Sequence, residues 1–222
     1  MHIDIKNVSK AYGKKQVLKD ISFSAEGGKC IGILGANGCG KSTFLSILAG
    51  VLERNSGAFL FNDVDLFQDR KKRSDLVGFV PQGTPLIEEL TAWDNLLLWF
   101  SRDNLKNELE NGVLKMLGID EFLKVTVRKM SGGMKKRLAI GCAMAKKPPI
   151  LLLDEPTAAL DLACKQKISD YLMKYKEAGG LLLLTTHDSL ELSLCDECYI
   201  IKDGVMHPFE YTGDLNMLVE SL

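Results

Sequence analysis

Residues 35–43 read GANGCGKST, a spacing of glycines ahead of a lysine and a hydroxyl that fits the pattern G-x-x-x-x-G-K-[ST]. Such glycines let backbone N–H groups curl around a phosphate, and the N-terminus of a following helix adds its dipole. Lys41 would neutralise β- and γ-phosphate oxygens, and the Ser42 hydroxyl would be a ligand for Mg²⁺. A chance glycine turn is the alternative. The buried-strand pattern CIGIL before the loop and the helical spacing of KSTFLSILAGVL after it favour the phosphate site.

Two further apolar runs end in polar residues that could act on a bound phosphate. The run ILLLD ends at Asp154, whose carboxylate can reach the Mg²⁺ shell, and Glu155 follows at once. Hydrolysis of a nucleoside triphosphate needs one acid for the metal and a neighbouring acid to take a proton from water. His187 ends the run LLLLTTH, which would place it beside the phosphates at the same sheet edge. The alternatives are two solvated acids that cap a strand end and a structural histidine.

The elements that must position these residues alternate between apolar strands and helices. The run DLACKQKISDYLMKYKEAGG has helical spacing and separates ILLLD from LLLLTTH. This alternation predicts an α/β core with a mostly parallel sheet covered on both faces. The opening segment HIDIKNVS alternates with period two, and SGAFLFNDVDL is expected to pair with it in an N-terminal antiparallel β subdomain. Helical patterns fill about 84–147, so we expect an inserted α-helical subdomain in one domain, 1–222.

The composition excludes several classes of protein. The 222 residues carry 28 Lys+Arg against 29 Asp+Glu, so no basic excess points to nucleic acid as a partner. The longest apolar runs have four or five residues, whereas a membrane-spanning helix needs about 20. Cys195 and Cys198 form a C-x-x-C, but no second cysteine pair stands at metal-binding spacing. We therefore expect a cytoplasmic protein with reduced thiols that does not itself cross a membrane but can work at one.

The stretch KMSGGMKKRLAIGCAMAKKPPILLLDEPTAALD, residues 129–161, joins several of these features. A Ser-Gly-Gly opens a basic amphipathic helix, the acid-ended strand follows, and the stretch closes on Ala-Leu-Asp. Together with the loop at 35–43, this order resembles the nucleotide-binding subunits of ABC transporters, and the likeness covers essentially the whole chain. The resemblance implies a P-loop NTPase (RecA-like) fold and hydrolysis of ATP with Mg²⁺, coupled to transmembrane transport.

Each motif of that family has a counterpart, in order, along this chain. Tyr12 resembles the aromatic residue that stacks on adenine, although a tyrosine packed in a hairpin is the alternative. Gln82 resembles the Q-loop glutamine that senses Mg²⁺ and the membrane partner, and Asp161 belongs to the D-loop. The other residues that the resemblance implies are Gly35, Asn37, Gly38, Cys39, Gly40, Lys41, Ser42 and Thr43 in the phosphate loop, Ser131, Gly132 and Gly133 in the signature, Asp154 at the metal with Ser42 and Gln82, Glu155 as the catalytic glutamate, and His187 as the switch histidine.

The signature departs from the family pattern, because the usual Leu-Ser-Gly-Gly-Gln reads Met-Ser-Gly-Gly-Met at 130–134. Its γ-phosphate contacts come from the serine hydroxyl, the glycine N–H groups and the helix N-terminus, so the lost glutamine amide removes a peripheral contact. Within the family, the signature of one copy closes over ATP held by another. This chain has a single phosphate loop and a single signature. The resemblance therefore implies that two copies, or this chain and a related one, sandwich two ATPs.

Three classes of function compete for these residues. The first is the ATPase subunit of a transporter whose channel is a separate chain, and the style of the sequence resembles the short bacterial subunits of ABC-2-type exporters. The second is a soluble ABC ATPase of translation or DNA repair, but those types carry two cassettes or long coiled-coil insertions, which 222 residues cannot hold. The third is a P-loop small-molecule kinase, which has no need of SGGM or AALD. The transported substrate is not encoded in this chain.

Residues 84–100, TPLIEELTAWDNLLLWF, are rich in large apolar side chains. A helix from about 91 would place four of them on one stripe, which we expect to be core. The stripe consists of Trp93, Leu96, Leu97 and Phe100. Leu86, Ile87 and Leu90 precede this helix, and in the resembling family the segment after the Q-loop receives a short helix of the membrane subunit. We expect these three side chains to be at least partly exposed, as anchors for such a helix.

Overall fold

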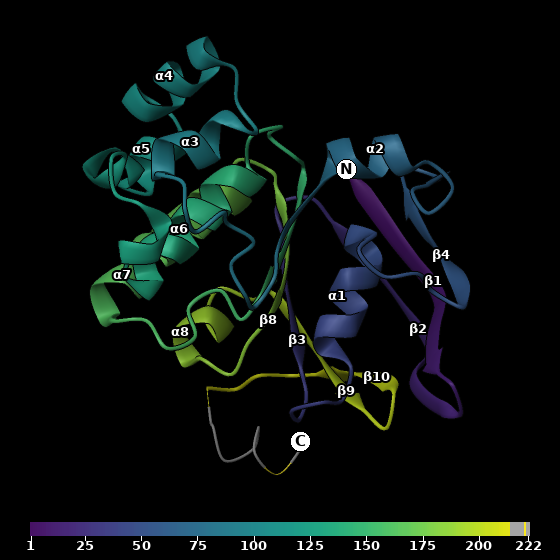
Figure 1. Ribbon diagram of the computed structural model, residues 1–222. Coiled ribbons are helices and arrows are strands. Elements are labelled where there is room, and N and C mark those ends of the chain that lie inside the picture. The colour runs from purple at the N-terminus through teal and green to yellow at the C-terminus, as the bar shows by residue number, and fades with distance from the viewer. Residues whose placement is uncertain (214–219, 221–222) are drawn as a thin grey trace.

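The computed structural model describes residues 1–213 and 220. Figure 1 shows two lobes: one contains two sheets with α1 (Lys41–Ala49) between them, and the other is a group of helices from the middle of the chain. Within the described residues, no helix is long and apolar enough to cross a membrane.

The smaller sheet is antiparallel, with the strand order β2-β1-β4-β5. Its strands are β1 (His2–Tyr12), β2 (Lys15–Glu26), β4 (Ser56–Phe61) and β5 (Val64–Asp65). Apolar residues alternate along β1, so that Ile3 and Ile5 are buried against α1. Ile3 lies opposite Ala25 on β2 and Phe61 on β4. The N-terminal antiparallel sheet predicted from the sequence is confirmed.

The larger sheet positions the polar residues at strand ends. Its strands, in spatial order, are β10 (Val205–Phe209), β9 (Glu197–Lys202), β3 (Cys30–Leu34), β8 (Leu181–Thr185), β7 (Ile150–Asp154) and β6 (Val77–Val80). All neighbours pair in parallel except β10, which is antiparallel to β9. Asp154 lies directly opposite Thr185, so the carboxyl ends of β7 and β8 meet at one edge. The predicted α/β core is confirmed, whereas the sequence pattern does not predict β9 and β10.

Both faces of the larger sheet are covered, as its continuous apolar strands require. Along β7, Ile150 and Leu152 pack with α1 and the smaller sheet. Leu151 and Leu153 point to the opposite face and pack with helices of the second lobe. All four side chains are fully buried. The sheet is therefore the shared wall of two hydrophobic cores, and its carboxyl edge is held from both sides.

The second lobe is formed by the helices between β6 and β7. They are α3 (Ala92–Leu97), α4 (Arg102–Glu110), α5 (Val113–Met116), the 3-10 helices η1 (Ile119–Phe122) and η2 (Val127–Lys129), and α6 (Gly132–Ala143). Elsewhere α2 (Arg70–Leu76) precedes β6, α7 (Leu162–Glu177) joins β7 to β8, and α8 (Ser189–Leu192) follows β8. Figure 1 shows α6 and α7 on the side of the sheet that faces this lobe.

The helix α3 is shorter than the apolar stripe predicted for it. It ends at Leu97, and Phe100 follows in a tight turn in which its N–H donates to the Leu96 carbonyl at 2.9 Å. Ser101 then caps α4, so the chain changes direction at this point. Leu96 and Phe100 are nevertheless buried, and Trp93 packs against the same core together with Leu97. The prediction that the stripe is core is confirmed, although it does not lie on one helix.

Candidate active site

A cavity of about 540 Å³ opens at the carboxyl edge of the larger sheet, and we call it the phosphate cavity. It is lined by Asn37, Gly38, Gly40, Lys41, Ser42, Thr43, Gln82, Glu155 and His187. These residues come from the loop before α1 and from the segments that follow β6, β7 and β8. The fold therefore brings together residues that are up to 150 positions apart in the sequence, from Asn37 to His187.

Lys41 is the buried cation of this cavity. Its ammonium donates hydrogen bonds to the Gly35 carbonyl at 2.6 Å and the Ala36 carbonyl at 3.3 Å. Both acceptors belong to the loop that precedes the lysine. The first backbone bond of α1 runs from the Phe44 N–H to the Gly40 carbonyl at 2.9 Å, and the N-terminus of α1 therefore begins inside the cavity. A positive charge, free N–H groups and the helix dipole all favour an anion here.

Asp154 and Glu155 form the end of β7, and Thr185 orders both of them. The Thr185 hydroxyl donates to the buried Asp154 carboxylate at 2.5 Å and accepts the Glu155 N–H at 3.0 Å. The same N–H also donates to the Thr185 carbonyl at 3.1 Å. Glu155 has a left-handed backbone, with φ 47°, which costs energy for a residue with a side chain. The neighbouring strand β8 thus holds the chain in the sharp turn that separates the two acids.

Gln82 closes the cavity from the end of β6. Its side-chain Nε2 donates to a carboxylate oxygen of Glu155 at 2.9 Å. The residues expected at the metal are Ser42, Gln82 and Asp154, which offer a hydroxyl, an amide oxygen and a carboxylate. This all-oxygen donor set fits Mg²⁺, which keeps several waters and binds through few protein ligands and through phosphates. Ser42 and Gln82 line the cavity, while Asp154 lies beneath it, bonded to Thr185.

His187 follows β8 and projects into the same cavity. Partial burial lowers the pKa of its imidazole, the positive charge of Lys41 lowers it further, and the Glu155 carboxylate acts in the opposite direction. The ordinary value is 6.5, so the ring is neutral at pH 7 and can donate one N–H. The strand-end position predicted for His187 therefore brings it into the same cavity as Lys41 and Ser42 of the loop.

Lys136 is a buried cation at this site that the sequence analysis did not single out. It lies on α6 and is 5% exposed, and its ammonium donates to the carbonyls of Pro81 and Gln82, both at 3.1 Å. Burial lowers the pKa of Lys136, and the negative charges of Asp154, Glu191 and Glu155 act against that shift. The sequence shows two adjacent lysines after the signature, but it does not show which of them turns inward on the helix.

Glu191 is a second buried ionisable residue near the site. It lies on α8 and lines a cavity of about 230 Å³ that also contacts Glu155 and His187. Burial raises the pKa of the Glu191 carboxyl, and the hydroxyls of Thr186 and Thr157 act to lower it. These threonines adjoin the segments that carry His187 and Glu155. Glu191 thus lies between the two segments, where no sequence periodicity could have indicated it.

Tyr12 ends β1, and its ring is 50% exposed in the turn between β1 and β2. The Lys10 ammonium lies 5.0 Å from the ring centroid. A tyrosine packed within the hairpin, the alternative considered from the sequence, would be less exposed than this. Tyr12 does not line the phosphate cavity, so its ring is available to an extended ligand only beyond the phosphates.

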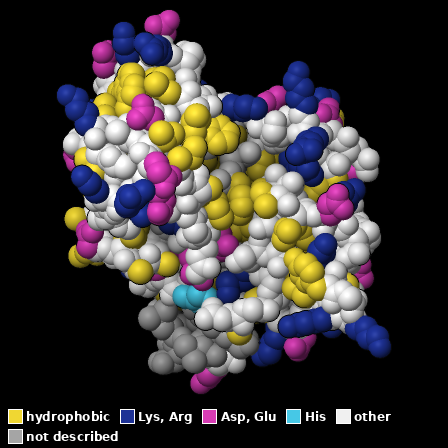
Figure 2. All heavy atoms as spheres, in the orientation of Figure 1, with side chains coloured by type: hydrophobic (Ala, Val, Ile, Leu, Met, Phe, Trp, Pro, Cys, Tyr) yellow, Lys and Arg dark blue, Asp and Glu magenta, His cyan; other side chains and the backbone are white. Residues whose placement is uncertain are grey.

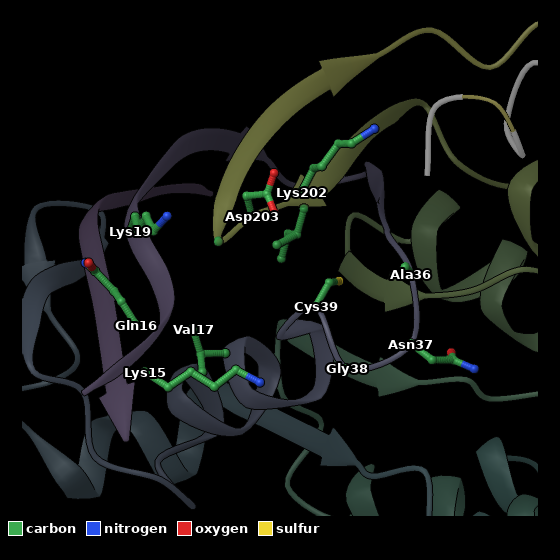
Figure 3. Close-up of a pocket in the computed structure, with 12 residues that line it drawn as sticks. Lys15, Gln16, Val17, Lys19, Ala36, Asn37, Gly38, Cys39, Lys202 and Asp203 are labelled. Carbon is green, nitrogen blue, oxygen red and sulfur yellow. The ribbon is translucent and has the colours of Figure 1, made fainter. Parts of the chain in front are cut away.

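Gly35 and Cys39 were placed with the phosphate contacts by resemblance, but neither lines the phosphate cavity. The Cys39 side chain points into a separate cavity of about 400 Å³, together with Lys19 and Asp203 (Figure 3). Gly35 has φ 146°, and a Cβ there would come within 2.5 Å of the Cys39 sulfur and 2.6 Å of the Ile201 carbonyl oxygen. The absence of a side chain at Gly35 therefore leaves the space that the Cys39 thiol occupies.

The signature residues also lie outside the phosphate cavity. Ser131 caps α6, and its hydroxyl accepts the Met134 N–H at 3.2 Å. A Cβ on Gly133 would lie 2.5 Å from the Cys164 sulfur, so a larger residue there requires the Cys164 side chain to move. Asp161 caps α7 by accepting the Cys164 N–H at 2.9 Å. In one chain, therefore, the phosphate loop and the signature belong to different surfaces.

The parallel sheet, the lysine-bearing loop and the carboxylates at neighbouring strand ends define a P-loop nucleoside-triphosphate hydrolase. A family model described as "ABC transporter" matches residues 18–158. The linearmycin resistance ATP-binding protein LnrL of Bacillus subtilis is 35% identical over 92% of this chain and 67% of LnrL. The Nod factor export ATP-binding protein I of Sinorhizobium fredii is 35% identical over 91% of this chain and 60% of that protein. This chain belongs to the ABC transporter family.

A solved structure agrees with this assignment. The ATP-binding cassette MJ0796, in a dimeric post-hydrolysis state bound to ADP and Pi, matches with a TM-score of 0.82 at 31% identity. The match covers 94% of this chain and 99% of that one. The protein is thus an ABC ATPase subunit that binds ATP with Mg²⁺ and hydrolyses it. It spans 60–67% of the length of the two relatives named above.

Proposed function

We propose that this ATPase acts as a pair of chains that enclose two ATPs, and that a separate membrane subunit uses the resulting motion for export. The observation that carries the proposal is the separation of surfaces within one chain. The phosphate cavity contains the loop, Glu155 and His187 but none of the residues Ser131, Gly132 and Asp161. A second copy, or a related chain, supplies its signature to that cavity. The dimer of MJ0796 supports this arrangement.

In the proposed reaction each cavity residue has one task. The loop N–H groups and Lys41 hold the phosphates, and Thr43 and Asn37 line the cavity around them. Tyr12, outside the cavity, stacks on the adenine. Ser42, Gln82 and Asp154 would hold Mg²⁺, which neutralises charge on the phosphate oxygens. Glu155 orients the attacking water and accepts its proton. His187 donates a hydrogen bond to the terminal phosphate. The signature residues of the partner chain complete the enclosure and exclude bulk water.

The surface that we propose for the membrane subunit lies at residues 84–100. Leu86 and Leu90 are partly exposed and Ile87 is 45% exposed, as predicted, and Leu98 and Trp99 are more exposed still. Figure 2 shows hydrophobic side chains gathered over the helical lobe and along the hollow between it and the lobe that carries α1. A short amphipathic helix of the membrane subunit would bury these side chains, as helices do in apolar grooves.

The segment is held rigidly enough to act as a preformed docking site. The buried Asn95 side chain accepts the Ile87 N–H at 2.9 Å and donates to the Ile87 carbonyl at 3.1 Å. The Leu90 carbonyl accepts the Val127 N–H at 2.9 Å. One buried side chain therefore binds both polar groups of the Ile87 backbone. Binding there costs little loop ordering, which favours a partner that docks and releases in each cycle.

We propose export as the direction of transport, in line with the relatives LnrL and the Nod factor export protein. Relatives named for import match at the same identity, so the membrane subunit would determine the direction and the cargo. Through that subunit the chain, as one ATPase domain, would lie peripherally on the cytoplasmic face of the membrane.

The shared site can be tested by mixing two inactive variants. Lys41→Ala loses the phosphate loop and keeps a normal signature, whereas Ser131→Arg loses the signature and keeps a normal loop. Each alone should lack ATPase activity, and an equal mixture should recover up to about a quarter of the wild-type rate, because half of randomly formed dimers contain one intact site of two. A mixture that stays inactive, while both variants melt like the wild type, contradicts the two-chain site.

A further inference from the structure

Lys136 connects two parts of the molecule that carry different motifs. It lies on α6, one and a half turns after Ser131 of the signature, yet its ammonium bonds to the loop that follows β6. Both acceptors are backbone carbonyls, those of Pro81 and Gln82, at 3.1 Å. A buried ammonium must find partners inside the protein, because a desolvated and unpaired charge is strongly unfavourable. Lys136 therefore fixes the path of the loop backbone relative to α6.

Three carboxylates surround this cation at longer range. Burial lowers the pKa of Lys136, while the charges of Asp154, Glu191 and Glu155 favour its protonated form. These acids lie at the end of β7 and on α8. The ammonium is therefore a buried positive charge that interacts with these three acids. The negative charges that favour the protonated form of Lys136 are those of these acids.

Gln82 is held from two sides as a result. Its carbonyl accepts a bond from Lys136, and its side-chain amide donates to Glu155 at 2.9 Å. A shift of α6 would move the Gln82 backbone, and a change at Glu155 would release the Gln82 side chain. The link from α6 to the catalytic glutamate therefore passes through one residue.

The adjacent lysine provides an internal comparison. The Lys135 side chain is 23% exposed and forms an ion pair with the exposed Glu88 at 3.4 Å. A partly exposed pair of this kind contributes little. Two consecutive lysines on one helix thus differ in surroundings: Lys135 lies at the surface, and Lys136 reaches the interior of the site.

We infer that Lys136 is a positioning residue for hydrolysis, which holds the Gln82 backbone so that the Gln82 side chain stays within reach of Glu155 and of the proposed metal site. This inference rests on the roles proposed above for Gln82 and Glu155. It concerns the rate of the chemical step, since Lys136 does not line the phosphate cavity and makes no contact with the phosphate loop there.

The first test compares substitutions that keep or remove the charge and the donors. Lys136→Met should lower kcat by about tenfold or more and change the KM for Mg-ATP by less than about threefold, since an interaction that serves only the transition state affects kcat. Lys136→Arg keeps the charge and the donors and should restore kcat to within about threefold of the wild type. The matched control, Lys135→Met, should retain the wild-type kcat. An unchanged kcat in Lys136→Met overturns the inference.

The second test is a double-mutant cycle with Gln82→Ala, which separates positioning from a general structural effect. If Lys136 acts through Gln82, the double variant has the kcat of Gln82→Ala alone. If instead the kcat of the double variant falls by the product of the two single losses, Lys136 does not act through Gln82. That result overturns the inference and leaves the role of Gln82 intact. A wild-type kcat in Gln82→Ala overturns both that role and the inference. Should Lys136→Met fail to fold, as judged by its melting temperature, Lys136→Gln keeps a donor without the charge and enters the same cycle.

Discussion

The side-chain amide of Gln82 lies 2.9 Å from the carboxylate of Glu155, and this single bond joins the segments that follow β6 and β7. The two strands are neighbours in the sheet, and both residues line the phosphate cavity. An uncharged donor orients Glu155 here without neutralising it. The position of Glu155 therefore depends on the loop that carries Gln82, the residue that we propose as a metal ligand.

Glu155→Gln should lower kcat by about 10²- to 10⁴-fold and leave ATP affinity unchanged, because an amide cannot accept a proton from water. The variant should also accumulate as a dimer with Mg-ATP, since the closed pair no longer ends in hydrolysis. Phosphate release and light scattering during size-exclusion chromatography measure the two effects. Glu197→Gln, at an exposed position on β9, is the control and should behave as wild type. Wild-type turnover in Glu155→Gln would show that Glu155 does not accept the proton from water.

Lys41→Ala and Ser42→Ala should fail in different ways. Without Lys41 the phosphates lose their buried cation, and the dissociation constant for ATP should rise by at least about tenfold with or without metal. Ser42→Ala should bind metal-free ATP normally but gain little from added Mg²⁺. Calorimetric titrations with EDTA and with Mg²⁺ distinguish the two, and Lys14→Ala in the exposed β1–β2 turn is the control. Identical Mg-ATP binding in both variants and the wild type would contradict the assigned loop.

Thr185→Val should lower the free energy of unfolding by about 1–3 kcal/mol, because the buried Asp154 carboxylate loses a hydroxyl donor and the Glu155 N–H loses one acceptor. Denaturant unfolding monitored by fluorescence gives this quantity. Thr126→Val is a matched control, since the Thr126 side chain makes no capping bond at the start of η2. A loss no larger than that of the control would show that Thr185 does not order the two acids.

Binding of Mg-ATP near pH 6.5 should take up protons through His187. In the free protein the pKa of His187 lies below its ordinary value of 6.5, because of partial burial and the charge of Lys41. Bound phosphates offset that charge and raise the pKa, so between the free and bound values binding adds a proton, and affinity increases as pH falls through this window. Calorimetry in buffers of different ionisation enthalpy measures the uptake. His187→Gln should lack it, and the same uptake in that variant would assign the proton to another group.

Ile87→Glu should prevent assembly with the membrane subunit while sparing basal ATP hydrolysis. Its side chain is 45% exposed and its backbone is held by Asn95, so the free energy of unfolding should change by no more than about 0.5 kcal/mol. Val64→Glu places the same charge at a 41% exposed position on β5 and is the control. Melting temperature, ATPase rate and co-purification of the membrane subunit are measured together. A variant that unfolds would show that Ile87 belongs to the core.

The positions that the sequence predicted correctly are those tied to strand ends. Asp154 ends β7 and His187 follows β8, and parallel strands share their carboxyl edge, so their position at one edge follows from the pattern alone. The burial of Lys136 and Asn95 was not predicted, because periodicity does not show which polar side chain of a helix turns toward the interior. Cys39 lines a cavity other than the phosphate cavity, which its neighbours Gly38 and Gly40 line, and the spacing of residues in the loop does not show on which side a side chain lies.

The close contact between Gly133 and Cys164 has a consequence for how this ATPase can be altered. The signature glycines also lie against the α7 side of the chain through Leu160, 3.6 Å from where a Cβ on Gly132 would be. The signature at 130–134 and residues 160–164 are therefore packed against each other, so a change in one alters the fit of the other. A chimera that receives a foreign signature at 130–134 needs the matching residues 160–164 from the same donor, and natural variants of these two segments should have changed together.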